Sequence, residues 1–225
     1  MPITRFLFEQ LRMEANAFLV GLQNILVPRR RALLRSIRNN RDLYVNVACG
    51  PLPLDGFLNL DLHATAAGVV RWDCRWNLPV ADGAAAGIRV EHFFEHLETQ
   101  EEAPHFLRDC HRALRPGGVI RIIVPDAARF LTAYCNGSPE AFCELGFAEP
   151  FPGDLPTRMD VVNHTFHQWH EHRWGYDAEN LRYRLEGAGF GQVQQMQFGC
   201  SLDPRLAADL PKHAPYSMYT DAVKD

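Results

Sequence analysis

The chain has 225 residues, of which 47% are hydrophobic and 22% are charged, and its formal net charge is -4. These values are typical of one globular domain with a sizeable core, and they exclude a globally disordered chain. The acidic balance argues against general nucleic-acid binding, because the field of the whole molecule does not attract polyanions.

The cysteines and the first apolar segment indicate the compartment. The six cysteines form no C-x-x-C pair, and a chain of this length needs no disulfide staples, so we expect reduced thiols in a cytoplasmic protein. Residues 6–26 are apolar but interrupted by charged and amide side chains. They therefore predict neither a signal peptide nor a spanning helix, and no integral membrane association is expected.

The N-terminal segment predicts two helices. Apolar residues recur at helical spacing over 3–27, Pro28 breaks the pattern, and a second short helix runs on to about Ile37. We expect a helical extension over 1–40, ahead of one domain over 41–225. Two uses remain open. The helices could pack across the domain or against a second subunit, giving a homodimer, or the run Arg29–Arg31 could contact a membrane surface.

From residue 43 short strands alternate with helices. Strands are expected at 43–47, 57–61, 68–72, 88–90, 119–124, 190–198 and 216–223. Helices are expected at 92–97, 100–114, 126–146 (in two pieces divided near 136–137) and 177–187. This alternation predicts an α/β fold: a doubly wound, mostly parallel, seven-stranded Rossmann-like sheet with helices on both faces.

Ligands of such sheets bind beyond the carboxyl ends of the strands. Three residues there suit a cofactor with an adenosine and an amino-acid tail. Gly50 lets the backbone approach the ligand closely, Asp61 after the second strand could grip a ribose diol, and Asp73 after the third could accept from an adenine amino group. Residues 148–172 hold several prolines and four histidines with little periodicity, so we expect an insertion that forms a lid on the acceptor side.

The order of the motifs carries more information than any one of them. VNVACGP at 45–51 and LNLD at 58–61 are followed by LPVADG at 78–83, HFFEHL at 92–97, LRPGG at 114–118, VPD at 124–126 and AGF at 188–190. Over residues 43–190 the chain resembles class I S-adenosylmethionine-dependent methyltransferases. Within them it is similar to small bacterial enzymes associated with surface-polysaccharide or other glycan biosynthesis.

The resemblance implies S-adenosylmethionine as the cofactor. The positions it assigns to cofactor binding are Ala48, Cys49, Gly50, Asp61, Leu62, Asp73, Glu91 and His92. Two of them depart from the family pattern. Ala48 replaces the usual first glycine, and Glu91 stands where Ser or Asn is common. The Glu91 carboxylate could contact the amino group of the cofactor, or it could be solvated. The first turn also holds Pro51-Leu52-Pro53, which suits a ligand without phosphates better than a dinucleotide.

The histidines raise the question of a metal. HFFEH at 92–96 matches the H-x-x-E-H pattern of inverted zinc peptidases, but the segment directly follows a strand at the methyltransferase position, so we expect no metal there. His164, His167, His170 and His172 form a polar cluster whose spacing cannot place all four on one helix face. Metal binding, acceptor binding and a solvated loop all remain open for this cluster.

An activated methyl group mainly requires alignment for in-line displacement, and a hydroxyl acceptor must also lose its proton. The candidates for that base are His92, His164, His167 and His172, with Asp126 as an alternative that could orient the acceptor. The expected acceptor is a small molecule, with a hydroxyl of a saccharide or sugar nucleotide as the first choice. Another small metabolite, or a cofactor-binding scaffold without activity that acts through its N-terminal helices, are the alternatives.

Overall fold

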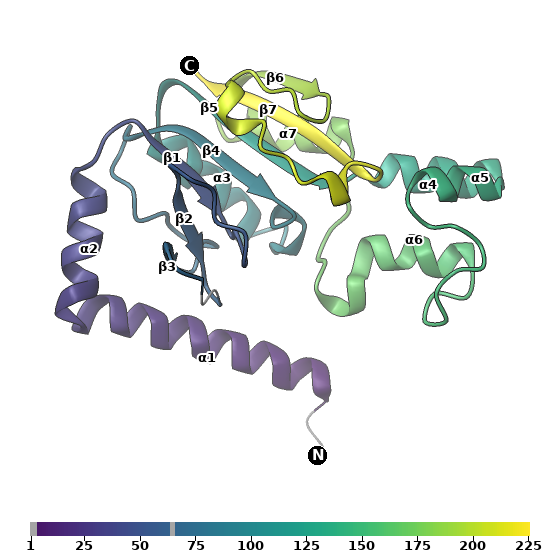
Figure 1. Cartoon of the computed structure of the whole chain (residues 1–225), viewed down its shortest axis with the longest axis horizontal. Helices are drawn as coiled ribbons and strands as arrows, with labels where there is room; N and C mark the ends of the chain where they lie inside the picture. The colour runs from purple at the N-terminus through teal and green to yellow at the C-terminus, as the bar shows by residue number, and fades with distance from the viewer. Residues whose placement is uncertain (1–3, 64–65) are drawn as a thin grey trace.

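The computed structural model describes residues 4–63 and 66–225. Its centre is one sheet of seven strands in the order β3-β2-β1-β4-β5-β7-β6 (Figure 1). The strands are β1 (Leu43–Val47), β2 (Leu58–Asp61), β3 (Val69–Arg71), β4 (Ala85–Glu91), β5 (Leu114–Pro125), β6 (Phe190–Met196) and β7 (Ser217–Lys224). All neighbouring pairs are parallel except those of β7, which runs antiparallel to both β5 and β6. The expected mostly parallel, seven-stranded class is confirmed.

One face of the sheet is apolar. Alternate residues of β1, β4 and β5, among them Val45, Ile88 and Ile120, point to this face and are fully buried. Helices α3 (Glu102–Ala113) and α7 (Ala178–Gly187) cover it with Phe106 and Leu181. Both helices were expected from their periodicity. Asp177 caps α7, because its carboxylate accepts the Asn180 N–H at 2.8 Å.

The opposite face carries a row of polar residues. Asn59, Asn46, Arg89, Arg121 and Asp221 are neighbours in register across five strands. A segment without an α-helix, residues 197–213, covers this face and includes the short helices η3 (Pro204–Leu206) and η4 (Pro211–His213). Arg121 is fully buried, and its guanidinium meets Asp209 at 2.6 Å and Asp221 at 2.7 Å. Arg121 is thus neutralised by Asp221 within the row and by Asp209 from the covering segment, while Arg89 pairs with Glu91 of its own strand.

Residues 126–170 form a separate helical layer beside the sheet. Helices α4 (Ala127–Asn136) and α5 (Pro139–Glu144) confirm the expected division near residue 137. The predicted lid differs from its expectation, because α6 (Arg158–His167) occupies much of it and η2 (Gln168–His170) follows. A capping box between Thr157 and Asp160 starts α6, and Val161 packs with Phe130 and Phe142 in a second core.

The helix expected over 92–97 is wrong. His92 has a φ of 51°, which an α-helix does not allow, and only the single turn η1 (Phe94–His96) follows. His92 and His96 therefore do not share one face of an α-helix. The zinc-peptidase interpretation of this motif, which requires that face, loses its geometric basis.

The N-terminal extension consists of α1 (Arg5–Leu26) and α2 (Pro28–Asn39), as expected. In Figure 1 α1 passes below the ends of β2 and β3. Asn16 contacts His63 at 3.1 Å and accepts from Arg71 at 2.7 Å, and Asn24 donates to the Arg71 carbonyl at 3.3 Å. Large apolar side chains remain exposed along α1: Phe6, Leu7, Phe8, Leu11, Phe18, Leu19, Leu22, Ile25 and Leu26. Among the described helices, none is long and apolar enough to cross a membrane.

Candidate active site

The turn after β1 is tied to the end of β2. Ala48 and Gly50 both lie in the left-handed region, with φ of 49° and 54°. The Asp61 carboxylate accepts the Gly50 N–H at 2.9 Å and the His63 N–H at 2.7 Å. Residues 48–57, all of them described, contain no helix. This connection between two parallel strands therefore presents backbone and one carboxylate, but no helix N-terminus.

The Cys49 thiol belongs to the same turn. Its side chain is half-buried, and burial first and the Asp61 charge second raise the pKa of this thiol to about 11. Cys49 is therefore a neutral, weakly reactive group at neutral pH.

Asp73 and Leu62 lie where α1 meets the sheet. The Asp73 carboxylate is bound by Arg75 at 2.8 Å, and the same guanidinium meets Glu14 of α1 at 2.5 Å and Glu102 at 3.3 Å. The Leu62 carbonyl accepts from Arg71 at 3.2 Å. In the structure Asp73 thus takes part in an ion network that holds α1. Its predicted contact with an adenine stays a prediction.

Glu91 is not solvated, so that alternative is wrong. Its buried carboxylate pairs with Arg89 and meets His213 Nδ1 at 3.0 Å and the Leu210 N–H at 3.2 Å. Burial would raise the pKa of this carboxyl, but the contacts with His213 and Arg89 outweigh it and hold the pKa below its usual range. Glu91 is an ionised group that fastens the segment 208–213 to the end of β4.

His92 lies at the end of β4 among polar and aromatic groups. Its backbone N–H donates to the Ile123 carbonyl at 2.9 Å. In the ring, Nε2 is 2.8 Å from Ser217 Oγ, and Nδ1 is 3.1 Å from Glu95 Oε1. The ring lies 3.9 Å, centroid to centroid, from that of His213. The imidazole is therefore held between a hydroxyl and a carboxylate, the arrangement that orients a histidine for proton transfer.

Glu95 is the most deeply buried charge of this cluster, with 1% of its surface exposed. His92 lies on one side of it, and on the other His172 Nε2 is 3.9 Å from Oε1. Burial would raise the pKa of Glu95, but the nearby His92, His96 and His172 together hold it low. Burial is the main cause that lowers the pKa of His172, which favours the neutral ring.

Two cavities flank these residues. A cavity of about 590 Å³ is bounded by α1, His63, Arg75, Phe93 and His96. A smaller one, of about 120 Å³, is lined by His92, His172 and Tyr216 together with aromatic side chains of the helical layer. The cluster around Glu95 thus lies between a large polar cavity beside α1 and a small, more apolar one beneath α6.

The four predicted catalytic residues do not all meet. The structure brings His92 and His172 together through Glu95. Asp126 caps α4, because its Oδ1 accepts from the Ala128 N–H at 3.1 Å, and burial is the main cause that raises its pKa. His167 is exposed and lines a different cavity of about 530 Å³, shared with His164, Trp169 and Asp160.

Sequence reasoning missed Glu95, Ser217 and His213 as members of the site. The motif HFFEH contains Glu95, but the sequence relates this motif to the methyltransferase resemblance and to a peptidase pattern without giving Glu95 a role of its own. Ser217 and His213 approach His92 from more than 120 residues away in the chain, as the sequence separations of their contacts show. No local pattern signals such a contact.

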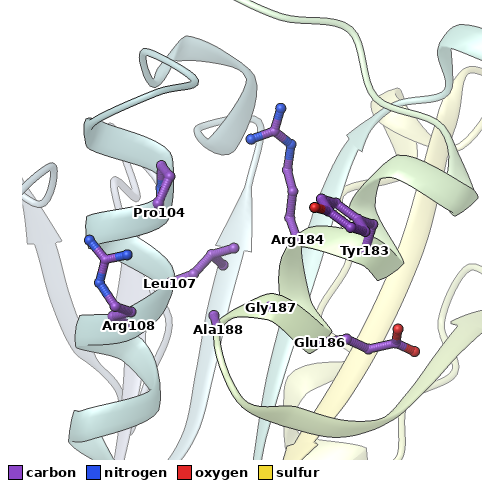
Figure 2. Close-up of a pocket in the computed structure, with 8 residues that line it drawn as sticks. All are labelled: Pro104, Leu107, Arg108, Tyr183, Arg184, Glu186, Gly187 and Ala188. Atoms are coloured by element: carbon purple, nitrogen blue, oxygen red, sulfur yellow. The ribbon is translucent and has the colours of Figure 1, made fainter.

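A further cavity of about 370 Å³ lies between α3 and α7 (Figure 2). Pro104 and Leu107 face it from α3, and Tyr183, Arg184 and Glu186 line it from α7. It lies on the helix-covered face and not at the carboxyl ends of the strands, where ligands of α/β sheets bind. We therefore place the candidate site around Glu95.

No protein-family model matches the chain, and no curated protein matches its sequence. Solved structures resemble it in fold. A S-adenosylmethionine-dependent methyltransferase from Archaeoglobus fulgidus is 16% identical, over 99% of this chain and 100% of that one, with a TM-score of 0.49. One from Mesorhizobium loti is 16% identical over 86% and 96%, with a score of 0.49. The 1,6-didemethyltoxoflavin-N1-methyltransferase of Burkholderia thailandensis, solved with S-adenosylhomocysteine, is 12% identical over 100% and 92%, with a score of 0.48.

Because the identities are this low and the TM-scores lie below 0.5, the fold class follows from the strand order of the chain itself. That order differs from the 3-2-1-4-5-6 order of the dinucleotide-binding fold by the antiparallel strand β7, which stands between β5 and β6. The chain is thus an α/β protein with a Rossmann-like sheet and a polar site at the carboxyl ends of its central strands.

Proposed function

We propose that the chain is an S-adenosylmethionine-dependent methyltransferase. The observation that carries the proposal is the turn 48–57, whose left-handed residues Ala48 and Gly50 are tied to Asp61 at the end of β2. A dinucleotide places its pyrophosphate on a helix N-terminus at this point. This turn has none, so it fits a nucleoside ligand without phosphates, and the order of the sequence motifs agrees.

In this proposal the turn and the carboxylate hold the cofactor. Gly50 gives the ligand a close approach to the backbone. Each carboxylate oxygen offers two lone-pair sites, so Asp61 can hold the turn and still accept from a ribose hydroxyl. Ala48, Cys49 and Leu62 complete the walls. Glu91 is buried against Arg89, so we assign it a supporting role for the end of β4.

In this proposal the acceptor binds on the side of His92 that faces away from the cofactor. The acceptor oxygen attacks the methyl carbon of the sulfonium, the carbon–sulfur bond breaks toward sulfur, and the acceptor proton leaves. The products are the methyl ether, S-adenosylhomocysteine and one proton. His92, held by Ser217 and Glu95, is the best-placed group to take that proton.

Two acceptor classes find support. A saccharide hydroxyl is our first choice, because the cavity of about 530 Å³ that His164 and His167 line also includes Asn163 and the exposed indole of Trp169. Another small metabolite is the second, because the cavity beside His92 is small and partly lined by Phe130 and Phe147. Methylation of sugars with no turnover of compact aromatic acceptors would decide for the first class.

Calorimetric titration with S-adenosylmethionine and S-adenosylhomocysteine tests the cofactor. We expect Asp61→Ala to weaken binding by about 10- to 100-fold, since a hydrogen bond to a charged group contributes about 1.5–3 kcal/mol. Asp82→Ala is the matched control, because this exposed carboxylate pairs with Arg112 away from the turn. Asp61→Asn keeps one acceptor and separates lost contact from a disturbed turn.

Two outcomes would count against the proposal. A folded wild-type chain that binds neither ligand would leave the scaffold alternative, in which the helices of the segment 1–40 carry the function. Cofactor binding that Asp61→Ala leaves unchanged would place the ligand elsewhere on the sheet. Binding without turnover of any acceptor would also favour the scaffold.

A further inference from the structure

We propose that Glu95, His96 and His172 form a binding site for one divalent transition-metal ion. The sequence predicts no metal at the motif 92–96 and leaves metal binding open for His172. Each of these residues offers one ligand atom, and the three atoms lie within 4.8 Å of one another. Glu95 and His96 come from η1, and His172 comes from the segment after η2. Two histidines and one carboxylate are a donor set that suits zinc and other first-row divalent ions.

The two imidazoles are already oriented as metal ligands. His172 Nδ1 is 2.7 Å from the Thr165 carbonyl, and His96 Nδ1 is 3.1 Å from the Glu171 carbonyl. A carbonyl oxygen can only accept, so in both rings Nδ1 carries a proton and donates it. Nε2 of each neutral ring then presents a lone pair. Histidines that bind metals commonly donate their other nitrogen to a carbonyl in this way.

The carboxylate gives a second, independent observation. Glu95 is 1% exposed, and its Oε2 accepts no hydrogen bond from any residue that the structure describes. Oε1 lies 3.1 Å from His92 Nδ1 and 3.9 Å from His172 Nε2. A buried ionised carboxylate with one unpartnered oxygen costs free energy. A divalent cation between Glu95, His96 and His172 would compensate the carboxylate charge and so remove this free-energy cost.

The geometry leaves room for a catalytic ion. With zinc–ligand bonds of about 2.0–2.1 Å, two ligands of a tetrahedral ion lie about 3.3 Å apart. Glu95 Oε1 and His172 Nε2 are now 3.9 Å apart, so small side-chain movements close the set. His172 also lines the small cavity beside His92, and His96 faces the cavity beside α1. Three protein ligands and an accessible cavity are the pattern of sites that keep a position for water or substrate.

The role of the ion rests on the proposed function. An acceptor hydroxyl at the open position would be polarised and oriented by the ion, which makes its proton easier to lose. The ion would thus place the acceptor oxygen next to His92, the residue that binds Ser217 and contacts Glu95. The binding of the ion itself does not depend on this role.

The test is calorimetric titration of the chelator-stripped full chain with zinc chloride. A second titration with cobalt chloride is followed by visible absorption of the bound cobalt. We expect one ion per chain. His96→Ala and Glu95→Gln should each weaken binding about 100-fold or more, since even loss of a ligand's hydrogen-bond partner weakens metal binding 10- to 100-fold. The control is His170→Ala, which removes an exposed histidine from the same cavity. It should bind zinc like the wild type.

The outcome of the zinc titration can be distinguished from the outcome of the cofactor titration. Asp61→Ala should bind S-adenosylmethionine about 10- to 100-fold more weakly and bind zinc like the wild type. His96→Ala should bind zinc more weakly and bind the cofactor like the wild type. No stoichiometric ion on the wild type would overturn the proposal, as would zinc binding that His96→Ala leaves unchanged or that His170→Ala weakens equally. If Glu95→Gln does not fold, His96→Ala decides, because His96 is partly exposed and its loss leaves the core intact.

Discussion

The buried Arg121 predicts a large and specific loss of stability. Its guanidinium and the Asp209 and Asp221 carboxylates are all fully buried, at 2.6 and 2.7 Å. Removing one partner of a buried ion pair costs about 3–5 kcal/mol, because the remaining charge stays in a medium of low dielectric. In Asp209→Ala the pair with Asp221 persists, so we expect the lower end, about 3 kcal/mol. For a chain of this size that lowers Tm by about 6–12 °C.

Thermal unfolding followed by circular dichroism measures the shift, with urea unfolding as the second measurement. The matched control is Asp42→Ala, which breaks an ion pair with Arg115 whose two side chains are 65% and 51% exposed. An exposed pair contributes at most about 1 kcal/mol, so the control should lose no more than about 4 °C. If the two variants shift Tm equally, burial does not decide the energy of this network and the reasoning is refuted.

Three further predictions concern the turn after β1 and the N-terminal helix. Ala48→Gly removes a left-handed non-glycine residue, at about 1–2 kcal/mol, and adds glycine flexibility, at about 0.5–1 kcal/mol. The net gain of about 0–1.5 kcal/mol should raise Tm by up to about 6 °C, and a lower Tm would contradict the strain. The raised pKa of Cys49, about 11, predicts slow labelling by a thiol reagent at pH 8, faster at each higher pH and behind that of exposed Cys200; equal rates, measured by mass spectrometry, would oppose this. Replacing exposed Phe18 and Ile25 of α1 with serine should weaken self-association in sedimentation experiments if the chain forms a homodimer there, and unchanged sedimentation would exclude that surface.

Elements with strong local signals could be predicted from the sequence. Asp177 and the glycines after α7 marked both ends of that helix, and the β-branched run within β5 marked the central strand. α6 also had a local signal, the Thr157–Asp160 capping box, but the prolines before it hid this signal. The failed helix at 92–97 depended on the backbone of His92, whose left-handed conformation no periodicity reveals.

The candidate site was harder to predict, because its contacts join distant parts of the chain. His96 and Glu171 meet across 75 residues, and Glu91 and His213 across 122. The motif order predicted where ligands gather, since the carboxyl ends of parallel strands share one edge. It could not show that Glu91 is neutralised by Arg89 or that Glu95 lies among three histidines, since these facts depend on tertiary packing.

The way α1 lies against the sheet has a consequence for the speed of ligand exchange. The helix bounds the large cavity, yet among its described side chains only Val20 and Asn24 are buried. Its contacts with the rest of the chain include the polar pairs Glu14–Arg75 and Gln10–Arg173 and the ring contact of the exposed Phe6 with His170. Detaching it exposes little apolar surface, so this opening requires far less free energy than global unfolding. Salt screens exposed ion pairs. Entry and release of a ligand in this cavity should therefore become faster as ionic strength rises, even where the affinity itself changes little.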